Sequence, residues 1–202
     1  MSGKGNSKLG SLFRTIGRWL AFILIGVVTA AIGETQYSVF IRGDTANLVG
    51  SMGFNAMYLS IWAVGTGLLL RLLGKRPLTI LLIATLSGFT GLMIEWFVIG
   101  NSPWGNPDAS NVGMFAYWAC LVVVPIALLD TTPQTGRLRR NILVFGLVYT
   151  LLALAVQLLP NADIRYAYHL WSVIVGYLAL LVMIVVGLVR GWAAAVPEAL
   201  AT

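Results

Sequence analysis

Charged residues are scarce in this 202-residue chain: Asp, Glu, Lys and Arg together make up 10% of it, while 58% is hydrophobic. In soluble domains roughly a quarter of the residues are charged, so this composition excludes a water-soluble globular fold. The apolar residues come in long runs, which lipid solvates directly. The sequence therefore predicts one integral membrane domain over residues 1–202.

Cysteine and histidine each occur once. Cys120 has no second cysteine, which excludes an intrachain disulfide, a CxxC redox pair and a thiolate cluster. His169 alone cannot supply a bis-histidine haem site or a two-histidine metal site. The chain also lacks a GxSxG elbow, a GxxxxGK[ST] phosphate loop and a GxGxxG turn after a strand. We therefore assign no catalytic residue and no metal site, and the cofactor stays unknown.

Six nearly uncharged runs are long enough to cross a bilayer, since a membrane-spanning helix needs about 20 apolar residues. They lie at 16–34, 48–70, 77–99, 111–129, 142–159 and 166–189. Breakers such as Gly74, Pro133 and Pro160 fall between them. We expect an all-α fold, a polytopic transmembrane bundle of about six helices.

Basic residues alternate with these runs along the chain. Eleven of the thirteen lie before the first run or after the second, fourth and sixth: Lys4, Lys8, Arg14, Arg18, Arg71, Lys75, Arg76, Arg137, Arg139, Arg140 and Arg190. Only Arg42 and Arg165 lie on the other side. The positive-inside rule then predicts cytoplasmic N- and C-termini. As the location we expect a bacterial inner membrane.

The net charge of +6 does not predict a nucleic-acid partner, because the basic residues are spread over short segments between apolar runs. In such segments they contact anionic lipid. We expect the lipid bilayer as the main partner, together with a hydrophobic small molecule or other membrane subunits.

The first run has a second interpretation, a cleavable signal peptide. A basic start, the apolar stretch 19–28 and the small residues Thr29, Ala30 and Ala31 fit that pattern. Cleavage would leave five spans, and the mass of the mature protein would decide between the two.

Small residues recur at helical spacing in several runs. They are Gly53, Ala56, Ser60, Ala63 and Gly67 in the second, Ala84, Gly88 and Gly91 in the third, and Gly176, Gly187 and Gly191 in the sixth. Small residues let helices approach closely in lipid. Such stripes predict tight packing within one bundle, with a homodimer face as the alternative.

Polar residues inside the runs fall near the predicted outer ends, where they usually face the bundle interior or a wet cavity. Helical spacing places Glu95 on the face of Gly88 and Gly91, and it directs Glu34, Gln157 and His169 to similar faces. We predict an outer-side cleft lined by Glu34, Glu95, Trp96, Asn111, Trp118, Gln157, His169 and Trp171. The alternative is a solvated rim with structural hydrogen bonds and interfacial aromatic residues.

Three functions fit this pattern. The leading one is a non-enzymatic subunit or small-ligand-binding module whose cleft accepts an amphipathic molecule or a partner helix. The second, a small transporter or channel, is weakened by the apolar cytoplasmic halves of the spans. The third is an intramembrane enzyme on a lipid-like substrate, with Glu95 and His169 as base and acid. The outer loop 100–108 is interpreted as a rigid turn or as a lid over Glu95.

Overall fold

The computed structural model describes residues 4–102, 104 and 111–200, with side chains from 15 to 195 in those ranges. Within these residues every regular element is helical. Six helical segments are long and apolar enough to cross a bilayer: Thr15–Ile41, Thr45–Leu73, Pro77–Ile99, Asn111–Leu129, Pro133–Val156 and Ala162–Ala195. The all-α expectation of six spans is confirmed, and the chain is an integral membrane protein.

The spans combine α-helices with short π-helical and 3₁₀ segments. In chain order these are α1 (Lys4–Glu34), π-helical η1 (Thr35–Ile41), α2 (Thr45–Leu73), α3 (Pro77–Ile94), π-helical η2 (Glu95–Ile99), α4 (Asn111–Leu129), 3₁₀ turn η3 (Pro133–Thr135), α5 (Gly136–Val156), α6 (Ala162–Trp171), π-helical η4 (Ser172–Gly176) and α7 (Tyr177–Leu200). The fifth and sixth spans begin earlier than predicted. Pro133 opens the η3 turn before α5, and the Asn161 side chain caps α6 by accepting Ile164 N–H at 3.1 Å.

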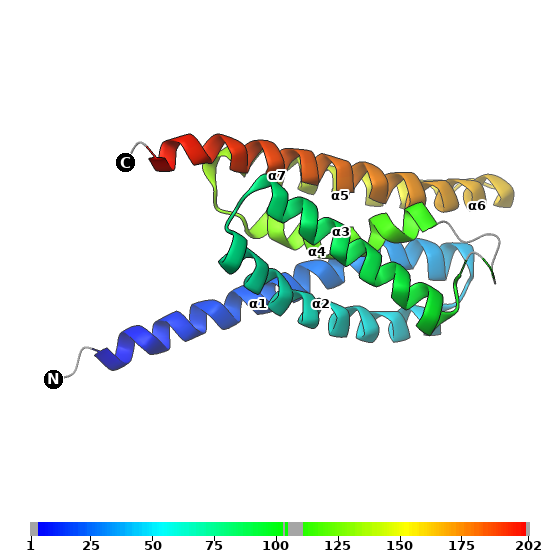
Figure 1. The fold of residues 1–202 in the computed structure, drawn as a ribbon. Helices are drawn as coiled ribbons and strands as arrows, with labels where there is room; N and C mark the ends of the chain where they lie inside the picture. Colours follow the sequence, from blue (N-terminus) through cyan, green and yellow to red (C-terminus); the bar gives the residue numbers. More distant parts are fainter. Residues whose placement is uncertain (1–3, 103, 105–110, 201–202) are drawn as a thin grey trace.

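Successive spans run in opposite directions, so both ends of the described chain lie at the same end of the bundle (Figure 1). That end also holds the loops after α2 and α4. We call it the basic end, because Arg18, Arg71, Lys75, Arg137 and Arg190 lie there. The opposite end, which holds η1, η2 and η4, is called the polar end.

Helix α4 forms the centre of the bundle and packs against α1, α3 and α7. In its most apolar 18-residue stretch 72% of the residues are buried, compared with 11% for the span that contains α5. Leu121 and Val122 of α4 and Ile184 and Leu188 of α7 are fully buried. The helix stays continuous across Pro125. Side chains on α4 can therefore reach partners on most other helices.

Glycines set the close approach of α3 to α4. A Cβ on Gly91 would overlap the Trp118 ring, and one on Gly88 would lie 2.5 Å from Phe115 Cε2. On the last span, a Cβ on Gly187 would lie 2.7 Å from Leu138 Cδ1 of α5. The packing role predicted for the small residues of the third and sixth runs is therefore confirmed.

The stripe predicted for the second run packs within the bundle only in part, since Ala63 lies in the core while three of its other members do not. A Cβ added to Gly53 or Gly67 would meet no atom within 4 Å among the described residues, and Ser60 is exposed. Helix α2 instead packs through the face that carries its larger buried side chains, which include Tyr58 and Leu59. Helical spacing identified a face of small residues, but not which face meets a neighbouring helix.

Candidate functional site

Glu34 at the end of α1 is the centre of the first polar network. Its Oε1 accepts the Tyr117 hydroxyl at 3.0 Å, and its Oε2 accepts the Ser38 hydroxyl at 3.1 Å. Asn55 donates to the Tyr117 oxygen at 3.0 Å, and Asn47 donates to Ser38 Oγ at 2.8 Å. A chain of hydrogen bonds thus runs from exposed Asn47 to buried Asn55. Protein donors occupy both carboxylate oxygens.

Glu95 opens η2 and is only 8% exposed, so the inward direction predicted from its helical face is confirmed. Its Oε1 accepts Trp118 Nε1–H at 3.0 Å, and its Oε2 accepts Asn101 Nδ2–H at 2.8 Å. Beside it, Trp96 Nε1–H donates to Asn111 Oδ1 at 3.0 Å. These contacts tie η2 to α4 at the polar end and leave neither oxygen of Glu95 without a donor.

His169 is fully buried between two amides. Its Nε2 lies 2.5 Å from Gln157 Nε2, and its Nδ1 lies 3.2 Å from Gln36 Oε1. A neutral ring with its proton on Nδ1 satisfies both contacts, because it accepts from one amide and donates to the other. Ser172 Oγ also donates to Gln36 Oε1, at 2.6 Å. Among the described residues no hydrogen bond or ion pair joins His169 to Glu95, so the two do not form the acid–base pair considered for an enzyme.

Three π-helical segments build this end of the molecule: η1, η2 and η4. They supply Gln36, Glu95 and Ser172, which all take part in the networks. Such segments are rare and occur often at functional sites. The first predicted span ends at residue 34, so the prediction missed Gln36. No signal in regular α-helical spacing could have placed its side chain inside.

The remaining predicted site features have mixed outcomes. Seven of the eight predicted residues hydrogen-bond to other side chains, whereas Trp171 is 62% exposed. Trp104 packs on Trp96 with ring centroids 5.3 Å apart. Within the turn or lid predicted at 100–108, residues 103 and 105–108 lie outside the described residues. Most polar groups at the polar end have partners, but Nε2 of the buried Gln36 has no hydrogen-bond partner among the described residues. A ligand at the eight predicted residues stays a prediction.

Asp130, which follows α4 at the basic end, is the centre of another network and was not predicted from the sequence. Its Oδ1 lies 2.6 Å from Lys75 Nζ and accepts the Thr132 hydroxyl at 2.8 Å, while its Oδ2 accepts Trp192 Nε1–H at 2.9 Å. Arg139 donates to its main-chain oxygen. Burial raises the pKa of the Asp130 carboxyl, but these side-chain donors and the charge of Lys75 outweigh burial and lower the pKa to about 2.

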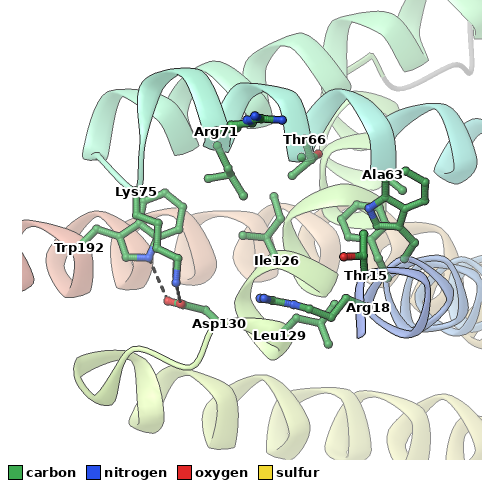
Figure 2. Close-up of a pocket in the computed structure, with 14 residues that line it drawn as sticks. Thr15, Arg18, Ala63, Thr66, Arg71, Lys75, Ile126, Leu129, Asp130 and Trp192 are labelled. Carbon is green, nitrogen blue, oxygen red and sulfur yellow. Dashed lines mark hydrogen bonds and ion pairs between the residues drawn. The ribbon is translucent and has the colours of Figure 1, made fainter. Parts of the chain in front are cut away.

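A cavity of about 400 Å³ lies beside this network, between α1, α2, α4 and α7 (Figure 2). Arg18, Arg71 and Lys75 line it, against the single carboxylate of Asp130, which Lys75 already neutralises. Figure 2 shows Arg18 reaching from α1 toward the Asp130 side of the cavity. In the part of the chain that the structure describes, neither arginine forms an ion pair. The cavity therefore carries an unbalanced positive charge.

Thr66 of α2 adds an unused hydrogen-bonding group to the same cavity. The residue is 4% exposed, and its Oγ1 has no hydrogen-bond partner among the described residues. A buried hydroxyl without a partner is costly. The apolar side chains of Phe22, Ile126 and Leu129 form other parts of the wall. Cationic groups, a free hydroxyl and apolar walls together suit an anionic, amphipathic molecule.

No protein-family model, curated protein or solved structure matches this chain.

Metal chemistry finds no support in the described residues, which hold no group of three or more His, Cys, Asp or Glu side chains that could bind an ion. Cys120 is buried in α4, and its thiol lies 3.3 Å from the main-chain oxygen of Tyr177. It therefore has the structural role expected of a small apolar packing residue. The cavity with unpaired arginines is the arrangement best suited to a ligand.

Proposed function

We propose that this protein is a non-enzymatic, multi-pass membrane module that binds an anionic phospholipid in the cavity at its basic end. The observation that carries the proposal is that Arg18 and Arg71 have no ion pair, and Thr66 Oγ1 no hydrogen bond, among the described residues around one partly apolar cavity. The amphipathic ligand expected from the sequence is retained. Its proposed place moves to the opposite end of the bundle, because the polar groups of the predicted cleft are used by one another.

We place the basic end on the cytoplasmic side of a bacterial inner membrane. The distribution of eleven basic residues out of thirteen supports this orientation. Anionic lipids in the cytoplasmic leaflet attract Lys and Arg near the membrane surface by about 1 kcal/mol each. The orientation therefore puts the cavity at the depth and on the side where an anionic headgroup is available.

The proposed binding mode follows from the chemistry of the lining groups. Guanidinium groups match phosphate oxygens through paired N–H donors, so Arg18 and Arg71 would hold the phosphodiester. Thr66 lies five residues before Arg71 on α2, about 7.5 Å deeper at 1.5 Å per residue, and would donate to an ester oxygen. The acyl chains would follow the apolar wall near Phe22 and Ile126 into the bilayer.

A charge-matched comparison tests the site. We expect Arg18→Gln with Arg71→Gln to weaken binding of phosphatidylglycerol to the purified full-length protein by roughly 30-fold, from about 1 kcal/mol per arginine. The control is Arg76→Gln with Arg140→Gln, which removes the same charge from two exposed residues at the same end that line neither cavity. Equal losses in the two double variants would reduce the effect to general surface charge and remove the proposal.

An isosteric pair tests the hydroxyl. Thr66→Val should lower phosphatidylglycerol affinity about tenfold, because it removes one donor to a charged ligand. Thr79 provides the matched control: its Oγ1 is also buried and has no hydrogen-bond partner among the described residues, but Thr79 does not line the cavity. Thr79→Val should leave affinity unchanged. The same affinity in both variants and the wild type would contradict the role given to Thr66.

A further inference from the structure

A second cavity, of about 600 Å³, lies at the basic end between α5 and α7. Arg137 and Asn141 of α5 line one side, and Arg190 of α7 lines the other. Apolar side chains continue the wall toward the middle of the membrane: Val182, Met183 and Val186. This cavity thus repeats the combination of a cationic mouth and an apolar interior, with a different set of residues.

The charge on the second cavity is also unbalanced. No Asp or Glu is among its described lining residues, and neither Arg137 nor Arg190 forms an ion pair there. Asp130, the nearest acidic residue in sequence to Arg137, is already bound to Lys75 and Trp192. Two cations therefore face one cavity from two helices, and their mutual repulsion would be relieved by an anion between them.

The span that contains α5 is the least buried of the six, with 11% of its most apolar stretch buried. The buried residues of α5 are Leu138, Ile142 and Ala153. Leu138 packs where Gly187 lets α5 approach α7, and both residues line the cavity. A molecule held there would extend the contact between α5 and α7 beyond these few side chains.

We infer that the second cavity binds the headgroup of another anionic phospholipid, with its phosphate between Arg137 and Arg190. Its acyl chains lie along Val182 and Val186, and the bound lipid ties α5 to α7. The apolar part of the wall favours a lipid over a free anion, because a free phosphate would leave that surface unused. This inference does not depend on the first cavity, since no residue is shared by the two.

The test counts lipids bound to the full-length protein by native mass spectrometry in titrations with phosphatidylglycerol. We expect two tightly bound lipids in the wild type and in Arg76→Gln/Arg140→Gln, and one in Arg137→Gln/Arg190→Gln. In that variant the affinity of the second cavity for phosphatidylglycerol should fall roughly 30-fold. Arg137→Lys/Arg190→Lys keeps the charge but not the paired N–H donors. Its affinity for the second lipid should therefore lie between that of the wild type and that of Arg137→Gln/Arg190→Gln.

The outcomes separate this inference from the proposed function. Two tight lipids in Arg137→Gln/Arg190→Gln overturn the second site, whatever happens at the first. A loss confined to that variant, with Arg18→Gln/Arg71→Gln unchanged, supports the second site and removes the proposed function. Suppose instead that millimolar inorganic phosphate displaces the second lipid and slows amide exchange in α5 as much as the lipid does. The ligand would then be a free anion, and the lipid would be overturned.

A structural readout tests the link between helices. In nanodiscs, phosphatidylglycerol should slow amide exchange in the first turns of α5 severalfold relative to phosphatidylcholine, because an ordered contact reduces local opening. Arg137→Gln/Arg190→Gln should abolish the difference between the two lipids. An unchanged difference in that variant would show that the headgroup acts elsewhere and would overturn the bridging role.

Discussion

The two ends of the bundle differ in whether their charged side chains are paired, although the basic end also holds the satisfied Asp130 network and the polar end holds the unpartnered Gln36 Nε2. At the polar end, Glu34, Glu95 and His169 are hydrogen-bonded to neighbouring side chains. At the basic end, Arg18 and Arg71 have no ionic partner, and Thr66 Oγ1 no hydrogen-bond partner, among the described residues. Polar residues inside a membrane therefore do not by themselves mark a ligand site. Those left unpaired beside a cavity are better evidence for one.

The largest loss of stability should come from breaking the contact between α3 and α4 next to the polar end. Gly91→Leu would push α3 away from Trp118 and separate Trp118 from Glu95, which should cost about 3 kcal/mol or more. The unfolding midpoint in detergent measures the loss. Gly53→Leu is the control, because a Cβ there would meet no described atom of another helix within 4 Å, and it should change stability by less than about 0.5 kcal/mol. Similar losses in both would contradict the packing argument.

A smaller loss is expected from opening the first polar network. Tyr117→Phe removes the hydroxyl between Glu34 and Asn55 and should cost about 1–3 kcal/mol, since two polar groups lose a partner. Tyr166→Phe, at a residue 51% exposed, should be neutral. Phosphatidylglycerol affinity should stay unchanged in both variants. A tenfold loss of affinity in Tyr117→Phe would mean that the polar end does take part in ligand binding.

Asp130→Asn should move stability and affinity in opposite directions. Replacing the carboxylate frees Lys75 to contact the headgroup, which should raise phosphatidylglycerol affinity about fivefold, or about 1 kcal/mol. The same change loses the ion pair, so stability should fall by about 1 kcal/mol. Thermal unfolding and lipid titration of one preparation check both signs. An affinity that falls together with stability would indicate that Asp130 shapes the cavity instead of competing for Lys75.

The smallest effect concerns acid. The pKa of Asp130 is about 2 in the folded protein, below its ordinary value of 3.8. A lowered pKa means that the ionised group stabilises the fold at pH values above about 4. That contribution is lost as the pH falls from about 4 to 2. After allowance for solvent around half-exposed Lys75, we expect the loss to be about 1 kcal/mol. The difference between wild type and Asp130→Asn should shrink over this range, and a constant difference would contradict the assignment.

The helices were largely predictable because length and hydrophobicity decide whether a segment can span a bilayer. Their ends were less so. The start of α5 contains Arg137, Arg139 and Arg140, which apolar runs exclude, yet it is helical because Leu138 packs against Gly187 and η3 leads into the helix. Tertiary packing extended this helix where composition predicted a loop.

The site was predictable only in part, for a different reason. Helical spacing correctly predicted that Glu95 points inward, but it could not identify which residues hydrogen-bond to a polar side chain. Glu34 and Tyr117 are 83 residues apart in sequence, yet their side chains hydrogen-bond. Whether a polar residue is satisfied therefore depends on helix arrangement, which apolar runs do not encode. For the same reason the sequence did not predict that Arg18, Arg71 and Thr66 would lack partners among the described residues.

The three π-helical segments have a consequence for comparing this chain with relatives. A π turn holds about one residue more than an α turn, and each residue of an α-helix advances by about 100°. Deleting one residue within η4 would thus swing His169 about a quarter-turn away from Gln36 while α7 kept its place. A single-residue gap in these stretches should be interpreted as a rotation of the following side chains about the helix axis. A residue aligned beyond such a gap would then no longer occupy the same place in space as its counterpart.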